Sequence, residues 1–281
     1  MPSPVLYISI RQHQVQMLEN INLDKKLARE EYKRIEPALQ ERLYHLEKAC
    51  WDQGIPSVIV FEGWDASGKG TTIAALTQRL DPRGFKLYPI TAARTYEQQR
   101  PWLWRFWLKV PNRGEMVIFD HSWYGRVLHE RVDGTVPEKA WKEAYRDIVE
   151  FERMLADDGA IFIKFFLHIS RKEQKRRFQA IEADPLKAWR VTDTDWNRNK
   201  KYDQYLIAIE EMLELTESEF APWTIVEATS KWHARKKVFE TIIDAMESRL
   251  GANAPPRTEA IEAMQDADLR AAMESLNGGG L

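Results

Sequence analysis

Short apolar runs alternate along the chain with segments that have the periodicity of amphipathic helices. Residues 24–50 place leucine, tyrosine and isoleucine at intervals of three to five positions, with charged residues between them, which predicts a helix that bends near Pro37. The apolar run 57–62 precedes a glycine-rich loop, and 71–80 has helical composition. The simplest prediction for this part of the chain is strand, loop and helix.

The same alternation recurs further along the chain. Apolar runs lie at 86–92, 116–119, 160–168 and 223–228, and helical segments are expected around 96–109 and over 137–157. Such runs, separated by helices, are typical of a parallel sheet that is covered on both faces. The pattern therefore predicts an α/β fold of three layers, with ligands at the carboxyl ends of the strands.

Two segments interrupt this alternation. Residues 170–205 form a basic helical stretch, an Asp-Pro turn and a second polar stretch, which predicts a lid over the strand ends. From Gly251 onward a Pro-Pro linker leads to a short Ala/Glu-rich segment and a glycine end, and we expect this tail to be poorly ordered or to dock weakly. The predicted organisation is an extension (1–23), one domain (24–250) and a tail (251–281).

Composition narrows the class of ligand. The chain has 281 residues, of which 44% are hydrophobic and 30% charged, the balance of a soluble globular protein. Its net charge is only −2, yet residues 164–201 carry eleven Lys/Arg against five Asp/Glu, a local excess of +6. A basic region on a near-neutral chain favours an acidic ligand at one place over diffuse binding of nucleic acid.

Two further features bear on the compartment. No apolar run approaches the roughly 18 residues of a membrane span, and the N-terminus lacks a signal peptide's basic and apolar regions, so no membrane association and a cytoplasmic location are expected. The single cysteine, Cys50, ends an amphipathic segment, which favours packing over chemistry.

The loop "FEGWDASGKGTTI" nearly matches the phosphate-binding pattern G-x-x-x-x-G-K-[ST]. Gly63 and Gly68 permit a tight turn and close backbone approach, the following helix directs N–H groups at an anion, and Lys69 adds a positive charge. Gly70 occupies the position of the usual hydroxyl residue, with Thr71 directly after it. The alternative is an ordinary glycine-containing turn between a strand and a helix.

An aspartate inside such a loop repels the phosphate unless something offsets its charge. A Mg²⁺ ion between Asp65 and the phosphates converts that repulsion into bridging, because Mg²⁺ prefers carboxylate and phosphate oxygens. Since Gly70 has no side chain, the metal has to rely on carboxylates unless Thr71 or Thr72 supplies a hydroxyl. The alternative is that Asp65 caps a turn and faces solvent.

The segment "GEMVIFDHSWYGR" places a second carboxylate after a buried strand. Asp120 ends four apolar residues, as a Walker-B aspartate does, and is the second candidate ligand for Mg²⁺, or for Mn²⁺ in its place. The alternative is a helix cap. His121 is a candidate donor or a structural histidine, Tyr124 is a further donor, and Arg126 can clamp a phosphoryl group bidentately.

Taken together, the motifs "EGWDASGKGTTI", "FDHSWYGR", "KEQKRRF", "DPLKAW" and "APWTIVEA" resemble the family-2 polyphosphate kinases, from about Leu23 to Arg249. The resemblance implies a P-loop-kinase-like fold with a helical lid. It also implies Mg²⁺-dependent, reversible transfer of the terminal phosphoryl group of inorganic polyphosphate to a nucleoside mono- or diphosphate. Homodimers or homotetramers are usual in the family.

The resemblance also assigns roles to individual residues. Asp65 corresponds to the family's loop aspartate, which helps to position or activate the acceptor phosphate, Lys69 to the loop lysine, and Asp120 to the Walker-B aspartate. The lid arginines correspond to Arg176 and Arg177. The chain departs from the family at two positions: His121 and Ile181 stand where the family has arginines, and the candidates to compensate are Arg126, Lys187 and Arg190.

These considerations define the expected site. The candidate catalytic residues are Asp65, Lys69, Asp120, Arg126 and Arg177, with Asp65 and Asp120 also as metal ligands. The candidate phosphate- or nucleotide-binding residues are Gly63, Ala66, Ser67, Gly68, Gly70, Thr71, Arg94, His121, Tyr124, Arg176 and Lys187. Trp64 and Trp123 are expected either to stack on a base or to pack.

The expected reaction uses polyphosphate as donor and an adenine or guanine nucleotide as acceptor. AMP is slightly favoured over ADP as the acceptor. Two alternatives remain open: an ATP-dependent nucleoside or nucleotide kinase on the same fold, and a non-catalytic protein that binds polyphosphate or nucleotide.

Overall fold

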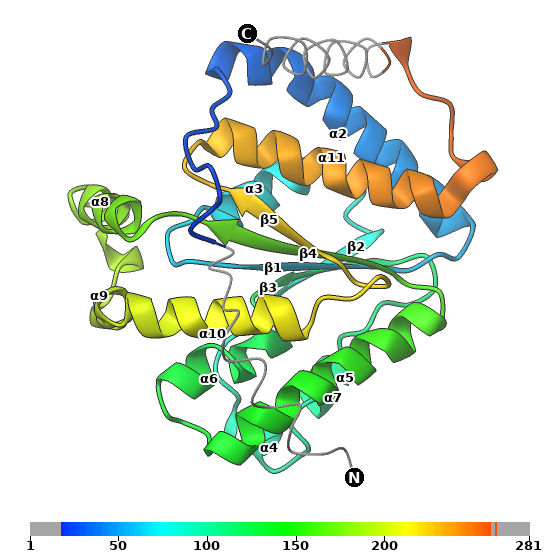
Figure 1. Cartoon of the computed structure of the whole chain (residues 1–281). Helices are drawn as coiled ribbons and strands as arrows, with labels where there is room; N and C mark the ends of the chain where they lie inside the picture. The colour runs from blue at the N-terminus through cyan, green and yellow to red at the C-terminus, as the bar shows by residue number, and fades with distance from the viewer. Residues whose placement is uncertain (1–17, 260–261, 263–281) are drawn as a thin grey trace, which may run out of the picture.

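A computed structural model describes residues 18–259 and 262 of the chain. Five strands form one parallel sheet in the order β2-β3-β1-β4-β5 (Figure 1). The strands are β1 (Ser57–Gly63), β2 (Phe85–Pro89), β3 (Met116–Asp120), β4 (Ile161–His168) and β5 (Trp223–Glu227). Each forms where the sequence has an apolar run, so the predicted parallel sheet is confirmed.

Helices cover both faces of the sheet, which confirms the three layers (Figure 1). One face carries α2 (Arg29–Asp52), α3 (Lys69–Leu76) and α11 (Lys231–Leu250). The other carries α4 (Thr95–Gln98), α5 (Trp104–Trp107), α6 (His129–Val132), α7 (Glu138–Asp157) and α10 (Tyr202–Leu215). Pro37 lies within α2, which is one helix from end to end.

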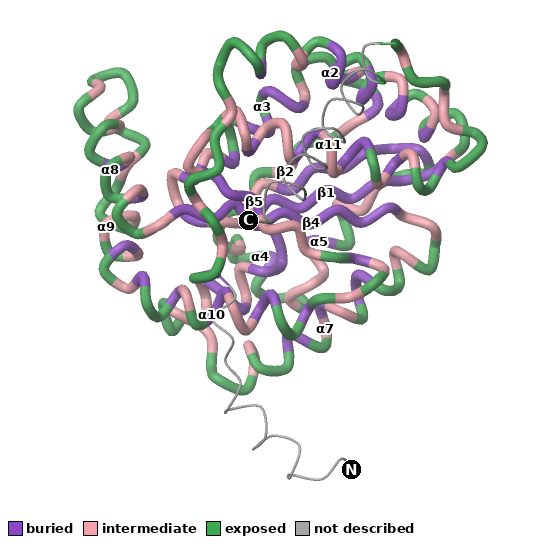
Figure 2. The backbone as a smooth tube through the Cα atoms, turned by 45° about the horizontal axis from the view of Figure 1, so that its top comes forward, coloured by how far each residue is buried: buried purple, intermediate pink, exposed green. Residues whose placement is uncertain are grey.

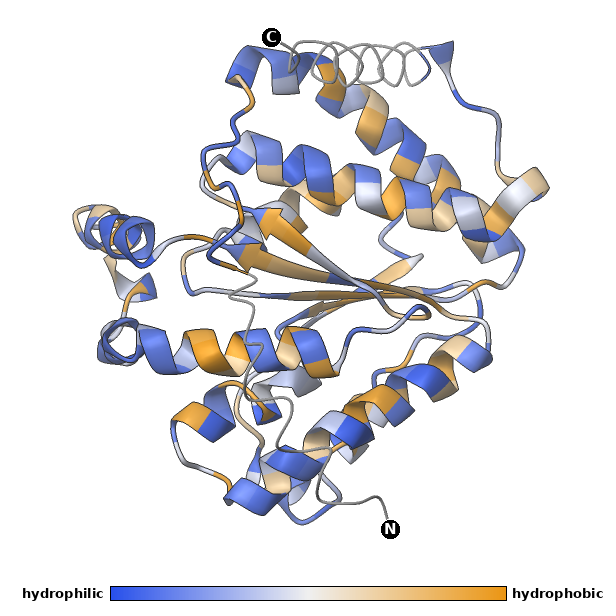
Figure 3. Cartoon of the chain, in the orientation of Figure 1, coloured by the Kyte–Doolittle hydropathy of each residue, from blue (hydrophilic) through white to orange (hydrophobic). Residues whose placement is uncertain are grey.

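The central strands are apolar and buried, while the helices turn their polar faces outward (Figures 2 and 3). A fully buried charged pair lies inside this core. Lys164 of β4 donates to Glu152 of α7 (2.8 Å), to the hydroxyl of Tyr124 (2.9 Å) and to the carbonyl of Thr216 (2.9 Å). All three ammonium donors are therefore satisfied, as a buried charge requires.

The basic segment folds as helices beyond the carboxyl ends of the strands, where a lid was predicted (Figure 1). It consists of α8 (Arg171–Glu182), the short turn η3 (Ala188–Arg190) and α9 (Asp193–Lys200). Most of its outer surface is exposed (Figure 2). A further short turn, η2 (Trp123–Arg126), follows β3.

The described parts of both ends contact the domain. Near the N-terminus, Leu18 is buried and its N–H donates to Glu210. After α11 the chain passes through η4 (Gly251–Asn253), and Arg42 then binds the carbonyls of Pro255 and Pro256. The rest of the predicted extension and tail lies outside the described residues. Within the described part of the chain, no helix combines the length and apolar character needed to span a membrane.

Candidate active site

The glycine motif covers the end of β1, the turn after it and the start of α3; we call these residues, 63–70, the phosphate loop. Gly63 has a φ of +141°, and a Cβ there would lie 2.5 Å from the backbone oxygen of Leu167 on the neighbouring strand. Gly68 caps α3 in the left-handed conformation, with a φ of +104°. Both positions therefore need glycine, as the motif predicted.

Lys69 folds back over the start of the phosphate loop. Its Nζ donates to the carbonyl oxygens of Gly63 (2.8 Å) and Trp64 (3.0 Å). The hydroxyl of Ser67 is buried and has no hydrogen-bond partner among the described residues. The hydroxyl of Thr71 instead donates to the carbonyl of Gly68, the residue that caps α3, at 2.9 Å. The loop thus offers a lysine and an unpaired hydroxyl where a phosphate is expected.

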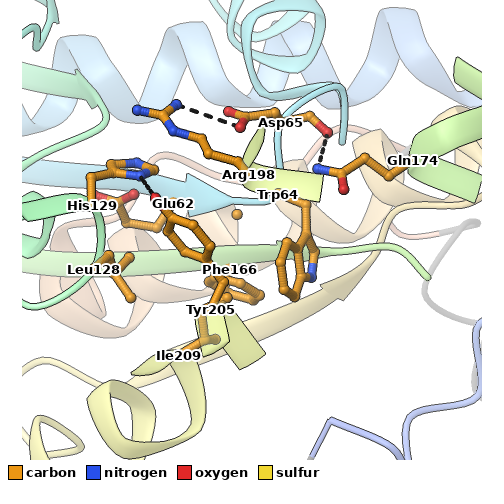
Figure 4. Close-up of a pocket in the computed structure, with 11 residues that line it drawn as sticks. Glu62, Trp64, Asp65, Leu128, His129, Phe166, Gln174, Arg198, Tyr205 and Ile209 are labelled. Carbon is orange, nitrogen blue, oxygen red and sulfur yellow. Dashed lines mark hydrogen bonds and ion pairs between the residues drawn. The ribbon is translucent and has the colours of Figure 1, made fainter. Parts of the chain in front are cut away.

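Asp65 faces the lid helix α9 rather than open solvent. Its Oδ2 lies 3.5 Å from Nη1 of Arg198, and Figure 4 shows the two side chains pointing toward each other. Burial alone would raise the pKa of Asp65, but the positive charges of Lys69 and Arg198 outweigh it and lower the pKa below its usual value. Asp65 is therefore a carboxylate at neutral pH, and the solvent-facing alternative does not hold.

Asp120 ends β3 beside the phosphate loop. It is opposite Phe61 in the register with β1, and a Cβ built on Gly70 would lie 4.0 Å from its Oδ2. Its other oxygen, Oδ1, is buried without a hydrogen-bond partner among the described residues. A buried carboxylate oxygen without a partner is costly unless another group binds it. Asp120 thus lies where the Walker-B interpretation placed it, with one oxygen free for a ligand.

His121 is tied to a buried glutamate. It adopts a φ of +59°, and its Nδ1 lies 3.1 Å from Oε2 of Glu62, whose other oxygen accepts from the hydroxyl of Ser122 (2.8 Å). Burial would raise the pKa of Glu62, but the hydrogen bond and the charge of His121 lower it overall. Glu62 was not among the sequence candidates, although it is a lone charge in an otherwise apolar strand.

A second histidine lies between Asp65 and α10. His129 Nδ1 is 3.4 Å from the hydroxyl of Tyr205 (Figure 4). Burial, and next the charge of Arg198, lower the pKa of His129 to about 4. His129 is thus neutral at pH 7 and adds no charge near Asp65. His129 and Arg198 were both missed in the sequence, because only the fold brings them to the loop.

A cavity of about 690 Å³ opens beside these residues. Its wall includes His121, His129 and Arg198, and also Trp102 and Arg126. The Arg126 guanidinium lies 5.1 Å from the Trp102 ring centroid, and its Nε is buried without a hydrogen-bond partner among the described residues. This volume is typical of sites for small organic ligands. Aromatic and arginine side chains suit a base and its phosphates.

Tyr124 does not reach the cavity, which corrects its assignment as a ligand-binding residue. Its side chain is fully buried, and its hydroxyl donates to Glu152 (2.7 Å) and accepts from Lys164. Trp123 is also buried and donates to Glu152 at 3.0 Å. Trp64 stacks on Tyr202 with ring centroids 3.9 Å apart. Both tryptophans therefore pack against protein side chains, and Trp123 also contributes to the cavity wall.

Arg177 requires a second correction. Its five N–H groups all have acceptors within the protein. Nε donates to Glu173 (2.7 Å), while Nη1 and Nη2 donate to the carbonyls of Ala66 (2.9 Å), Ser67 (3.0 Å), Ala228 (2.7 Å) and Thr229 (3.0 Å). No donor is left for a phosphate in this arrangement, so Arg177 binds the phosphate loop itself.

The remaining predicted cations have partners outside the phosphate loop. Arg176 pairs with Glu173, and 67% of its side chain is exposed. Lys187 pairs with Asp184 in the turn after α8. Arg94 precedes α4, where its backbone N–H donates to a glutamate side chain. Arg190, suggested as a compensating residue, lies over the ring of Trp189 in the exposed turn η3.

Comparison with known proteins identifies relatives of this chain. The chain is 41% identical over 240 residues to the polyphosphate:AMP phosphotransferase of Pseudomonas syringae, covering 85% of this chain and 48% of that protein. It is 36% identical over 210 residues to the AMP/ADP-polyphosphate phosphotransferase of Meiothermus ruber, covering 74% and 79% respectively. The chain thus spans about half the length of the Pseudomonas relative.

A solved structure agrees with these matches. The crystal structure of polyphosphate kinase 2 from Arthrobacter aurescens superposes with a TM-score of 0.80 at 28% identity, over 90% of this chain and 92% of that one. The family model described as polyphosphate kinase 2 matches residues 26–253, which include the phosphate loop, Asp120 and the lid helices. The chain belongs to the polyphosphate kinase 2 family.

Proposed function

We propose that this chain transfers the terminal phosphoryl group of inorganic polyphosphate to a nucleoside mono- or diphosphate, with AMP and ADP as the acceptors. The supporting observation is the position of Asp120, whose unpaired oxygen lies beside the phosphate loop at Gly70. Relatives named as polyphosphate:AMP and AMP/ADP-polyphosphate phosphotransferases support the choice of donor and acceptor.

Asp120, together with Asp65, would hold a Mg²⁺ ion in the proposed reaction. Asp120 has a buried oxygen without a partner, Asp65 is deprotonated, and Gly70 leaves room that a side chain would fill. The described residues contain no group of three or more His, Cys, Asp or Glu that could hold a metal. Most ligands of the ion would therefore be phosphate and water oxygens, as is usual for Mg²⁺. When bound, it neutralises charge on the phosphates, and Mn²⁺ can replace it.

Lysine and arginine side chains then bind the phosphates and neutralise their charge. Lys69 and the N–H groups at the start of α3 bind phosphate oxygens. Arg126 and Arg198, on the cavity wall, neutralise charge on the transferred group and the acceptor. An acceptor phosphate oxygen forms the new P–O bond as the anhydride P–O bond of polyphosphate breaks, and the shortened polyphosphate leaves. The protein's contribution is mainly alignment and charge neutralisation.

The acceptor is proposed to lie in the 690 Å³ cavity, with its base near Trp102. A homodimer or homotetramer is also proposed. Exposed apolar side chains on α2, Tyr44 and Trp51, offer a face for the contact, since such side chains at an interface are removed from water. Light scattering of the purified protein tests this assembly.

A nucleotide panel tests the reaction. The full chain is incubated with Mg²⁺, inorganic polyphosphate as sole donor, and AMP, ADP, GMP or GDP, and products are separated by anion exchange. We expect ADP from AMP or ATP from ADP. Transfer from ATP but not from polyphosphate would instead identify an ATP-dependent kinase, and saturable binding without turnover would identify a binding protein.

A further inference from the structure

Two side chains of α8 bind consecutive carbonyl groups of the phosphate loop. Gln174 Nε2 donates to the carbonyl of Asp65 (3.1 Å), and Arg177 Nη1 donates to those of Ala66 (2.9 Å) and Ser67 (3.0 Å). Gln174 and Arg177 are three positions apart and so share one face of the helix. Figure 4 shows the Gln174 amide turned toward the Asp65 carbonyl. The lid helix thus holds the outer side of the loop.

Gln174 and Arg177 are each held in place by further hydrogen bonds to other parts of the protein. Arg177 Nη2 binds the carbonyls of Ala228 and Thr229, between β5 and α11, and its Nε binds Glu173. Gln174 is buried, and its Oε1 accepts from Asn199 of α9 at 2.8 Å. The loop is therefore linked to three separate elements: α8, α9 and the turn before α11.

These contacts set the direction of the loop's N–H groups. In a planar trans peptide the C=O and the N–H point to opposite sides. Because the carbonyls of Asp65 and Ser67 face α8, the N–H groups of Ala66 and Gly68 face away from it. Neither N–H has a hydrogen-bond partner among the described residues. Such unpaired N–H groups in a turn form an anion-binding concavity.

The backbone at this point also needs external support. Ala66 has a φ of +58°, a left-handed conformation that non-glycine residues adopt at a cost. Strain of this kind persists where the surroundings enforce it. The carbonyls on either side of the Ala66 Cα, those of Asp65 and Ala66, are the ones that Gln174 and Arg177 bind.

We propose that α8 is a splint for the phosphate loop, in which Arg177 and Gln174 are positioning residues that keep the loop's N–H groups directed at the bound phosphate. Arg177 acts through the backbone and does not contact the phosphate. A lysine cannot replace Arg177, because a single ammonium group cannot bind two carbonyls of the phosphate loop and two carbonyls before α11, as the planar guanidinium does. The kinetic consequences rest on the proposed function, whereas the effect on the loop does not.

Hydrogen exchange of the ligand-free protein tests the splint directly. Arg177→Lys keeps the charge, and Gln174→Met keeps the volume of the buried side chain without its hydrogen bonds. Amide exchange is followed by mass spectrometry in peptides that cover the phosphate loop and, separately, β4. We expect at least tenfold faster exchange of the loop's hydrogen-bonded amides, those of Trp64 and Ser67, for both variants, with β4 unchanged. The control Lys175→Ala, at an exposed position of α8, should match the wild type in both peptides.

Steady-state kinetics with AMP and polyphosphate supply a second readout. Only the substrate whose phosphates occupy the loop should respond, so we expect Arg177→Lys to raise one KM at least tenfold and to leave the other within twofold. A merely structural lesion would lower kcat with the folded fraction and leave both KM values unchanged, which overturns the proposal. Wild-type loop exchange with a raised KM also overturns it, because Arg177 would then bind phosphate directly.

The two proposals can fail separately. Absence of transfer from polyphosphate in the wild-type protein would refute the proposed function alone. The exchange experiment would still decide whether α8 supports the loop, since it uses no substrate.

Discussion

Arg198 Nη1 lies 3.5 Å from Asp65 Oδ2, so a side chain of the lid helix α9 neutralises the aspartate inside the phosphate loop. The pair joins residues that are 133 positions apart in the sequence. Arg198 therefore already supplies the positive charge that the Asp65 carboxylate attracts. A cation that binds Asp65 therefore competes with Arg198 or shares the carboxylate with it.

The first prediction concerns the pH dependence of activity. Arg198→Gln removes a charge that lowers the pKa of Asp65, so that pKa should rise. Asp65 acts as a carboxylate and its function is lost as the pH falls through its pKa, so the acid limb of kcat/KM should move to higher pH. An arginine beside an aspartate typically accounts for a shift of about 1 unit or more.

The pH profile of kcat/KM measures this shift. The same substrates are used for both proteins, so their own ionisations cancel in the comparison. Lys200→Gln removes one charge from an exposed position of the same helix and should leave the acid limb in place. Equal shifts in the two variants would mean that the general field of the lid, rather than the Arg198–Asp65 contact, sets the pKa.

The second prediction concerns the repulsion between Asp65 and phosphate. Asp65→Asn should fold normally, and turnover should fall by roughly 10²–10³-fold or more, as when a transition-state contact is removed. Without divalent cations the same variant should bind inorganic tripolyphosphate more tightly than the wild type, because a negative charge has left the loop. With Mg²⁺ present the order should reverse.

Calorimetric titration with tripolyphosphate, in EDTA and then in Mg²⁺, measures both affinities. Asp157→Asn makes the same chemical change at an exposed position at the end of α7 and should behave as the wild type. Near wild-type turnover in Asp65→Asn would show that the carboxylate has no part in the reaction. The same order of affinities in both buffers would separate Asp65 from the metal.

The third prediction contrasts two glycines of the phosphate loop. In Gly63→Ala the new Cβ would lie 2.5 Å from the oxygen and 2.7 Å from the nitrogen of Leu167, and the backbone of β4 cannot easily move. We expect a loss of more than about 3 kcal/mol of unfolding free energy. In Gly70→Ala the nearest atom is Asp120 Oδ2 at 4.0 Å, and α3 should gain up to about 1 kcal/mol.

Urea unfolding followed by tryptophan fluorescence measures the two stabilities. The kinetic readout for Gly70→Ala is activation by Mg²⁺, because its methyl group enters the space beside Asp120. The Mg²⁺ concentration for half-maximal activity should rise while the fold is retained. If Gly63→Ala proved as stable as Gly70→Ala, β1 and β4 would not be as close at this point as 2.5 Å implies.

The sequence predicted the parts of the site that depend on local spacing. The phosphate loop and Asp120 follow from short motifs, because a strand, a glycine turn and a helix fix their geometry within a few residues. The contact between Asp65 and Arg198 depends on how α9 docks, and no local pattern encodes it.

Arg177 and Tyr124, whose predicted roles were corrected, show that a residue's type does not reveal which group its side chain contacts. The family resemblance made Arg177 a phosphate-binding lid arginine, but backbone carbonyls also carry partial negative charge and satisfy a guanidinium equally well. Tyr124 and Arg126 both lie in the short turn η2, yet the first enters the core and the second faces the cavity. A turn of four residues has too little periodicity to reveal which side chains point inward.

The last prediction concerns stability in acid. His168, at the end of β4, is buried, and its Nδ1 accepts a hydrogen bond from the indole of Trp64 at 2.9 Å. Burial lowers the pKa of His168 to about 4, whereas an unfolded chain has a histidine pKa of about 6.5. The unfolded state therefore binds the proton first. The stabilisation of the folded state that comes from neutral His168 is fully present above pH 6.5 and is lost as the pH falls toward 4.

The expected loss is about 3 kcal/mol of unfolding free energy between pH 7 and pH 4. His168→Gln has no group to protonate there, so the stability difference between wild type and variant should change by about that amount over this range. Urea unfolding at several pH values measures the difference. A difference that is independent of pH would show that His168 does not link folding to protonation, and the hydrogen bond from Trp64 would then have to survive in acid.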